Sequence, residues 1–340
     1  MKRFKIERIN IFSIIFILLF VLLFSFVSLA HYAGTPVSES KAVYTVDVPR
    51  GASFARIVDI LYEAGVIKGR PLFYLLAFTQ QAAGRIKAGE YEFTNSSTPL
   101  EMIDKMIRGD IKAYLVTFPE DIMLKEVAAR LATYRLADEE TFLKLSRNRD
   151  FLASLGIESD SLEGYLFPDT YLFDRSMETR GVIRVMVRQF WKKVTPEMRE
   201  RARQRGFTIQ ELVTLASIIG KESGNREEKP LIAAVFNNRL KKGMKLQSDP
   251  TAVYGLPDFS GVIKRRHLNN STPHNTYYIK GLPPTPIANP GLDSLQAALN
   301  PAPVNYLYFV SRNDGTHYFS ADFGAHNEAV SRFQNSKEKE

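Results

Sequence analysis

The sequence predicts an α+β protein that follows one N-terminal transmembrane helix, and three patterns support this prediction. Residues 11–30 form a run of twenty residues without a charge, long enough to span a bilayer as a helix. Amphipathic helical periods then alternate with short segments of strand character. The composition, 45% hydrophobic and 24% charged over 340 residues, is typical of globular domains, and the length allows two or three of them.

The N-terminus predicts the compartment. Residues 1–10 form a basic tail, and basic residues before a membrane span stay in the cytoplasm. We therefore expect a single-pass protein of the inner (cytoplasmic) membrane that contacts the lipid bilayer through residues 11–30, with the rest of the chain periplasmic or otherwise extracytoplasmic. A cleaved signal peptide is the alternative, because the sequence Ser-Leu-Ala at 28–30 resembles a cleavage site. The length of the apolar run favours the uncleaved anchor.

The net charge, the cysteine content and the spacing of the histidines limit which partners and metal sites the sequence predicts. The net charge of +8 suits an anionic partner such as nucleic acid, lipid or an anionic polymer, or it serves solubility alone. A location outside the cytoplasm argues against nucleic acid. The chain has no cysteine for a disulfide or a thiolate metal site, and its five histidines lack HExxH or other close ligand spacing. We therefore expect neither a metal nor a cofactor. The sequence also lacks a Gly-rich phosphate loop and a GxSxG motif.

An internal repeat predicts two related βα modules after a short polar linker at 31–44. The segment "VDVPRGASFARIVDIL" begins at Val46, and "VTFPEDIMLKEVAARL" begins at Val116, an offset of 70. Each copy predicts a short strand, a turn that contains proline, and an amphipathic helix. We assign the first module to 45–115, and expect it to contain a strand at 90–94 and a helix that ends at Gly109.

The second module and a helical connector are expected within residues 116–205. They are interrupted at 162–173 by "LEGYLFPDTYLF", which we expect to be a loop with four aromatic residues around Pro168-Asp169. Aromatic residues there could stack on sugar rings or pack a domain junction, and packing is the commoner outcome. Residues 206–335 are predicted to form a mixed domain of helices and short strands, with a hairpin turn at "NDG". A charged tail follows at 336–340.

The helix predicted at 208–222 carries the most informative residue. A capping box of Thr208 and Glu211 marks its start, and Glu222 ends it on the apolar face that Leu215, Ile218 and Ile219 share. Burial and the negative end of the helix dipole both raise the pKa of a carboxyl there, as a general acid requires. The neighbouring Lys221 should point elsewhere but could reach back and oppose the shift.

A structural role for Glu222 is the alternative. It would then pair with an arginine such as Arg239 and only hold two helices together, and spacing alone favours this role.

Several long motifs resemble one known family. The segments "LASIIGKES", "FNNRLKKGMKLQSDPTAVYGL", "HNTYYIKGLPPTPIANPGLDSLQAALNPA" and "YLYFVSRNDGTHYFS" closely resemble the endolytic murein transglycosylases, the MltG/YceG family. The upstream segments "GYLFPDTYLF" and "IKAGEYEF" are also similar, and the order is kept over roughly residues 45–335. The resemblance implies a membrane-anchored lyase with a LysM-like module beside a catalytic domain. Its substrate would be peptidoglycan glycan strands, cut between N-acetylmuramic acid (MurNAc) and N-acetylglucosamine (GlcNAc) to leave 1,6-anhydro-MurNAc ends.

The resemblance also implies residue roles and partners. The family's catalytic glutamate maps onto Glu222, which would act first as the general acid and then as the base. Peptidoglycan synthases are implied as protein partners. Amides, hydroxyls and aromatic rings suit sugar recognition, which makes these residues the candidates for substrate binding: Gln247, Ser248, Asp249, Tyr254, Asn275, Thr276 and Tyr277.

Two further possibilities stay open at this point. The place of Asp249 before Pro250 favours a loop-fixing role, but a second acid at Asp249 or Asp169 would permit hydrolysis. A membrane-tethered peptidoglycan-binding scaffold without catalysis is the alternative from another functional class. The polar loops at 247–277 argue against it, since a scaffold would not need them.

The sequence departs from the family pattern at two places. Family members often carry a glutamate two residues before the catalytic one, where this chain has Gly220, and the turn that usually has the sequence PEG is PED at 119–121. Glycine weakens the last helical turn by up to about 1 kcal/mol. This leaves the role of Glu222 in place and predicts, at most, reduced activity.

Overall fold

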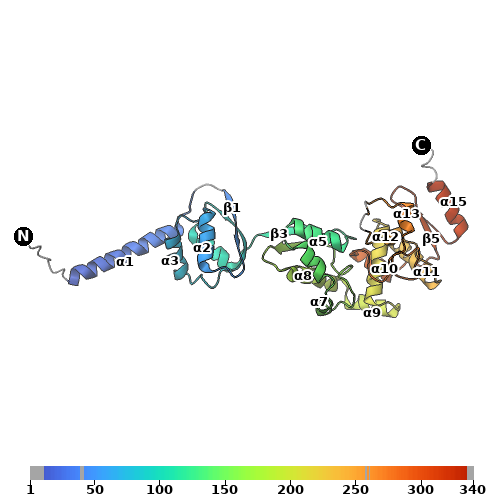
Figure 1. Cartoon of the computed structure of the whole chain (residues 1–340), viewed down its shortest axis with the longest axis horizontal. Helices are drawn as coiled ribbons and strands as arrows, with labels where there is room; N and C mark the ends of the chain where they lie inside the picture. The colour runs from blue at the N-terminus through green and yellow to red at the C-terminus, as the bar shows by residue number, and fades with distance from the viewer. Residues whose placement is uncertain (1–10, 39–41, 257–258, 260, 335–340) are drawn as a thin grey trace, which may run out of the picture. The chain divides into compact units, whose positions relative to one another are not determined.

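The computed structural model describes residues 11–38, 42–256, 259 and 261–334. The tails predicted at 1–10 and 336–340 lie outside the described residues. The chain divides into two compact units, one of Met1–Tyr114 with Asp174–Ser176 and one of Leu115–Phe173 with Met177–Glu340. Each unit mixes helices with a small antiparallel sheet, so the protein is α+β as predicted (Figure 1).

The first unit begins with a long apolar helix, α1 (Ile11–Gly34). By length and composition, α1 alone among the described helices could cross a membrane, with a mean hydropathy of 3.0 over an 18-residue window. The helix continues four residues into the segment expected to be a linker, because its end is part of the first module. Leu29 and Tyr32 pack against the hydrophobic core of that module, and Ala33 is buried in it.

The first module contains an antiparallel pair of strands, and two helices separate these strands in the sequence. Strand β1 runs beside β2 from Val43 opposite Thr94 to Val48 opposite Gly89. Val46 and Val48 of β1 and Tyr91 and Phe93 of β2 point into the core, two residues apart as the pleat of a strand dictates. Helix α4 begins at a Thr98–Glu101 capping box and ends at Gly109, as predicted. The elements are β1 (Val43–Val48), α2 (Phe54–Glu63), α3 (Arg70–Thr79), β2 (Gly89–Thr94) and α4 (Pro99–Arg108).

The second module repeats this order with one helix added. Val116, Val127 and Leu131 are buried at the positions equivalent to Val46, Ile57 and Leu61 of the first copy. The elements are β3 (Ala113–Thr117), α5 (Leu124–Thr133), α6 (Glu139–Leu145), α7 (Arg149–Ser154), β4 (Thr170–Asp174) and α8 (Thr179–Lys193), and β3 pairs with β4.

The repeat extends into the second half of each module, with an offset of 80 instead of 70. Tyr171 and Phe173 stack on each other as Tyr91 and Phe93 do. In both copies the tyrosine hydroxyl donates to the carbonyl four residues earlier, at 2.7 Å to Lys87 and 2.6 Å to Phe167. The loop expected over 162–173 was wrong for its last four residues, where β4 begins at Thr170, and its four aromatic residues are buried.

The C-terminal part of the second unit is built around α10. Every residue of this helix from Leu212 to Gly220 is buried, and α9, α11, α12 and α14 contact it. Strands β5 and β6 form the hairpin predicted at "NDG", with Asn313 in the left-handed conformation at its turn. The elements are α9 (Pro196–Gln204), α10 (Ile209–Glu222), α11 (Lys229–Lys241), α12 (Asp249–Val253), α13 (Arg265–Leu268), α14 (Leu292–Leu299), β5 (Tyr308–Ser311), β6 (His317–Ser320) and α15 (Phe323–Phe333).

Removing the buried hydroxyl of the second module should lower stability. In Tyr171→Phe the carbonyl of Phe167 loses its donor in the interior, which should cost about 1–2 kcal/mol of unfolding free energy. Urea denaturation followed by the fluorescence of Trp191, the one tryptophan of the chain, measures this unit directly. Tyr278→Phe is the matched control, because that hydroxyl donates to Asn269 at 3.1 Å from an exposed position. Equal effects of both variants would contradict the prediction.

Candidate active site

Glu222 lies where the buried helix α10 reaches a solvent-accessible cavity. The Thr208–Glu211 capping box starts the helix as predicted, and Ser223 ends it in an extended conformation. Ile218 and Ile219 on the same face are fully buried, whereas Glu222 is partly exposed. The cavity has a volume of about 570 Å³. The described residues that line it come from α10, α11, the start of α12 and the segment before it, the segment between α13 and α14, the β5–β6 hairpin and α15: Glu222, Arg239, Leu246, Gln247, Asp249, Tyr277, Tyr308, Phe309, Val310, Ser311, His317, Phe323, His326, Val330 and Gln334.

Burial controls the acidity of Glu222. Removal from water raises its pKa to about 7. The hydrogen bond that Ser248 Oγ donates to Glu222 Oε1 opposes this, and so does the positive charge of Arg239, while the negative charge of Asp249 adds to it. A carboxyl with a pKa near 7 holds a proton in half of the molecules at neutral pH, so it can both donate and accept one.

Arg239 is close to this carboxyl but is held by other groups. Its Nε donates to the Leu307 carbonyl at 2.7 Å, and one terminal nitrogen donates to the Leu246 carbonyl at 2.7 Å. Within the described residues, no ion pair joins Arg239 to Glu222. Lys221 also points away, since its Nζ contacts the carbonyl of Asp121 at 3.4 Å.

The structure brings four of the seven predicted substrate-binding residues to Glu222. Gln247, Asp249 and Tyr277 line the cavity, and the Tyr277 hydroxyl donates to Asp249 Oδ1 at 2.5 Å. Ser248 is almost fully buried behind them and reaches Glu222 with its hydroxyl. Gln247 has a positive φ of 50°, so the backbone turns sharply where this segment enters the cavity.

The other three predicted residues do not face the cavity. Asn275 is fully buried and donates to the carbonyls of Leu268 and Asn270. Thr276, also buried, accepts from the backbone N–H of Ser248 at 2.9 Å. Thr276 therefore supports the segment that carries Ser248, whereas Asn275 holds the loop at 268–270. The hydroxyl of Tyr254 donates to Glu163 at 3.0 Å, away from the cavity.

Several cavity residues were not predicted from the sequence, and three of them, Tyr308, Phe309 and Phe323, are aromatic. The ring of Tyr308 lies 5.1 Å from that of His326, and the guanidinium of Arg239 lies 5.3 Å from the Tyr308 ring. Phe323 extends the same aromatic wall. The density of aromatic residues on both sides of the "NDG" turn was the available signal.

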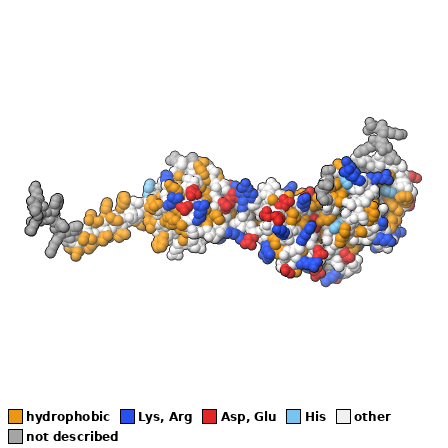
Figure 2. All heavy atoms as spheres, in the orientation of Figure 1, with side chains coloured by type: hydrophobic (Ala, Val, Ile, Leu, Met, Phe, Trp, Pro, Cys, Tyr) orange, Lys and Arg blue, Asp and Glu red, His pale blue; other side chains and the backbone are white. Residues whose placement is uncertain are grey.

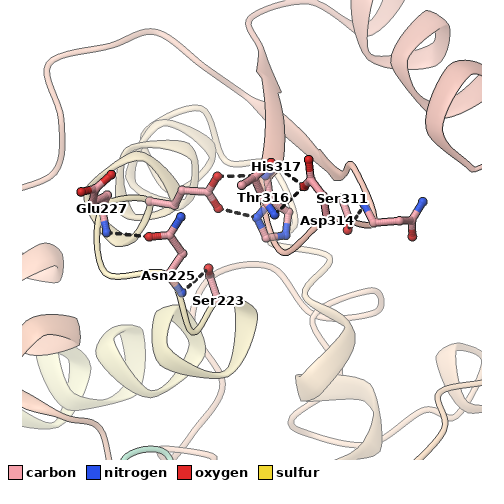
Figure 3. A network of polar contacts seen from close by, with 9 residues as sticks. Ser223, Asn225, Glu227, Ser311, Asp314, Thr316 and His317 are labelled. Atoms are coloured by element: carbon pink, nitrogen blue, oxygen red, sulfur yellow. Dashed lines mark hydrogen bonds and ion pairs between the residues drawn. The ribbon is translucent and has the colours of Figure 1, made fainter.

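His317 joins the hairpin to the segment that follows Glu222. Its Nδ1 lies 2.7 Å from Glu228 Oε2, and its backbone N–H donates to Glu228 Oε1 at 2.9 Å. Figure 3 shows the supporting contacts on each side: Ser223 and Asn225 tighten the turn after α10, and Thr316 bonds to Asp314 in the hairpin. These contacts fix the hairpin against the end of the helix that carries Glu222.

The two departures from the family pattern are in contact with each other. A Cβ at Gly220 would lie 1.9 Å from Asp121 Oδ1, so the Asp121 carboxyl fills the space that a side chain at 220 would need. Where the family pattern has a carboxylate on the helix and glycine in the turn, this chain has the reverse. The Oδ1 atom of Asp121 is buried and has no hydrogen-bond partner among the described residues. Removal of this carboxyl from water raises the pKa of Asp121 to about 6, against the opposing charge of Lys229.

The internal repeat shows that Asp121 occupies a glycine position. The equivalent residue of the first module is Gly51, with a φ of 73°, and Asp121 has a φ of 61°. A residue with a side chain is disfavoured in this left-handed region. The carboxyl is therefore present at a conformational cost, and its contact is the back of α10, two residues before Glu222.

Substitution of Gly220 should reveal this contact. We expect Gly220→Ala to lower the unfolding free energy by about 1–3 kcal/mol through overpacking, although alanine favours helices more than glycine does. In an Asp121→Gly background the same change should cost less, and the coupling between the two sites should reach about 0.5–3 kcal/mol. Urea denaturation of the four variants measures the cycle. Gly224→Ala, in open space just past α10, is the control. An equal cost in both backgrounds would refute the contact.

Comparison with known proteins agrees with the motifs. The model of the YceG-like family matches residues 46–332. An endolytic murein transglycosylase of Bacillus subtilis is 31% identical over 316 residues, which cover 88% of this chain and 87% of that protein. A protein of the same name from Streptococcus pneumoniae is 27% identical, and its match covers 88% of this chain and 60% of that protein. A crystal structure of a putative yceG-like protein from Listeria monocytogenes is similar with a TM-score of 0.59 and 31% identity, and covers 85% of this chain and 100% of that one. The chain belongs to the YceG-like family.

Proposed function

We propose that this protein is a membrane-anchored endolytic lytic transglycosylase that cleaves the MurNAc–GlcNAc bond of peptidoglycan and forms 1,6-anhydro-MurNAc ends. The observation that carries the proposal is the carboxyl of Glu222, which has a pKa near 7 at the edge of a cavity with aromatic and polar walls. The names of the relatives agree with this activity.

One carboxyl suffices for the proposed reaction. Glu222 protonates the glycosidic oxygen while the bond from C1 of MurNAc to that oxygen breaks. The C6 hydroxyl of the same MurNAc then bonds to C1, and its proton passes to the Glu222 carboxylate. The catalyst returns to its protonated form without consuming water, and a pKa near neutrality serves both half-reactions.

The remaining cavity residues would bind the glycan. We assign Gln247, Asp249 and Tyr277 to substrate contacts, and add Tyr308 and His317 from the hairpin. Aromatic rings cover the apolar faces of pyranose sugars, and amides, phenols and carboxylates bond to their hydroxyl and N-acetyl groups. Ser248 instead contacts the catalyst, Thr276 supports the segment of Ser248, and Asn275 holds the loop at 268–270.

The location and partners belong to the same proposal. Helix α1 would anchor the chain in the inner membrane with its N-terminus in the cytoplasm and the cavity outside. We propose a LysM-like, glycan-binding role for residues 45–115, supported by the resemblance and by an independent core in that module. Peptidoglycan synthases remain proposed partners.

Digestion of purified sacculi by the protein tests the reaction, with the muropeptides analysed by mass spectrometry. Anhydro-muramyl products are expected. Products without the anhydro ring would indicate a hydrolase, with Asp249 as the second carboxyl because it lines the same cavity. Binding of glycan with no product would instead indicate a scaffold.

Glu222→Gln should lower the rate of cleavage by about 10²–10⁴-fold, because the amide cannot transfer the proton. Sacculus binding and the fold should persist, since the amide keeps the shape of the carboxyl. Glu200→Gln is the control: this carboxylate lies exposed on α9, where it pairs with Arg203. Normal cleavage by Glu222→Gln would exclude the mechanism.

Cleavage should fall as the pH rises through about 7, because only protonated Glu222 can act as the acid. The raised pKa also makes stability depend on pH. Ionisation of Glu222 costs more free energy in the folded protein than in the unfolded chain, so the unfolding free energy decreases as the pH rises from 4.5, the ordinary pKa of a glutamate, to about 7.

A pH profile of kcat/KM for the wild type and for Ser248→Ala tests whether Glu222 is the group whose ionisation stops cleavage. Loss of the Ser248 hydrogen bond removes a contact that lowers the pKa, so the falling limb should move to higher pH. An unchanged limb would contradict the role given to Ser248.

A further inference from the structure

Helix α3 of the first module is apolar on both of its faces. Phe73, Leu76 and Ala77 are buried in the module core. The opposite side carries four exposed residues, which we call the α3 face: Leu72, Tyr74, Leu75 and Phe78, with exposed fractions of 39%, 36%, 43% and 80%. A helix that is apolar all round is normally covered on all sides. Phe54 of α2 partly covers this face, since its ring lies 5.5 Å from that of Tyr74, but all four side chains stay exposed and Phe78 most of all.

Helix α3 lies next to the end of the apolar helix α1. The two helices contact each other, and the Tyr32 hydroxyl donates to the carbonyl of Gly69, the residue before α3, at 3.3 Å. Figure 1 shows α3 crossing the end of α1, at the edge of the module from which α1 emerges. Figure 2 shows apolar side chains continuing from α1 onto this side of the module.

The distance along α1 is short. The apolar run ends at residue 30, and Tyr32 already contacts the start of α3. Two helical residues rise only about 3 Å, whereas the headgroup layer of a bilayer is on the order of 5–7 Å thick on each side. If residues 11–30 fill the hydrocarbon core, α3 lies at the depth of the headgroups.

The residues around α3 suit that environment. Lys68 and Arg70 stand at its start, and Arg70 lies 4.3 Å above the ring of Tyr62. Tyr74 belongs to the face itself. Tyrosine, lysine and arginine are enriched where a membrane meets water, because each joins an apolar body to a polar tip.

We propose that α3 is an interfacial helix whose α3 face inserts into the outer leaflet and holds the first module on the membrane surface. The proposal rests on the membrane anchor proposed for α1. The lipid bilayer is the occupant that the observations favour, because the α3 face continues the apolar surface of a helix that would itself lie in lipid.

Spin labelling tests the proposal in the full chain. The protein has no cysteine, so Phe78→Cys gives a single labelling site without removal of another. The control is Val43→Cys, on β1 of the same module, where the side chain is 62% exposed. Both are labelled with a nitroxide and placed in nanodiscs of phosphatidylethanolamine and phosphatidylglycerol, one chain per disc. Collision with oxygen, which concentrates in lipid, is compared with collision with a water-soluble nickel complex.

The ratio of oxygen to nickel accessibility should be several-fold higher at position 78 than at position 43. Equal ratios in chains that remain bound to lipid would overturn the interfacial helix and leave the anchor standing. Low accessibility to both reagents at position 78 would mean that protein covers the face, which also overturns the proposal. Flotation with liposomes tests the anchor itself. A chain that does not float has no membrane anchor, and the proposed interfacial helix then fails together with the anchor.

Discussion

The burial of α10 is the constraint on which the candidate site depends. Every residue from Leu212 to Gly220 is buried, and only Glu222, in the last turn, lines the cavity. The helix therefore fixes the position of Glu222, and partial removal of its carboxyl from water raises its pKa to about 7. The Ser248 segment and the β5–β6 hairpin are arranged around this fixed end.

The last turn of α10 is held from two sides. On the cavity side, Ser248 contacts Glu222 and is itself held by Thr276. On the back, Asp121 fills the space at Gly220. The second contact comes from the β3–α5 turn of the repeated module, and the first module carries glycine at the same place. The two copies share the backbone conformation at this position. Only the second copy has a side chain there, and its carboxyl contacts α10 at Gly220.

Local sequence patterns were enough to predict helix α10 and the position of Glu222, but they could not predict contacts between residues far apart in the sequence. The capping box and the 3.6-residue period sufficed to place Glu222 at the end of a buried face. Asn275 and Gln247 are indistinguishable as polar loop residues, yet one satisfies buried carbonyls and the other lines the cavity. The position of His317 is fixed by its contact with Glu228, a residue far away in the sequence, so a local pattern could not predict it. The second half of the repeat was missed because the second module is ten residues longer, which changes the offset from 70 to 80 and hides the match of Tyr91 with Tyr171.

The surroundings of Asp249 bear on whether the site uses one carboxyl or two. A hydrolase would need this group free to activate water on the far side of the sugar. Instead its Oδ1 accepts the Tyr277 hydroxyl at 2.5 Å, and its negative charge raises the pKa of Glu222. Ser248 and Arg239 act in the opposite direction. These opposed influences leave Glu222 near neutrality, where one group can give up a proton and recover it within a single turnover. Asp249 is then better explained as a part of what sets that balance than as a second catalyst.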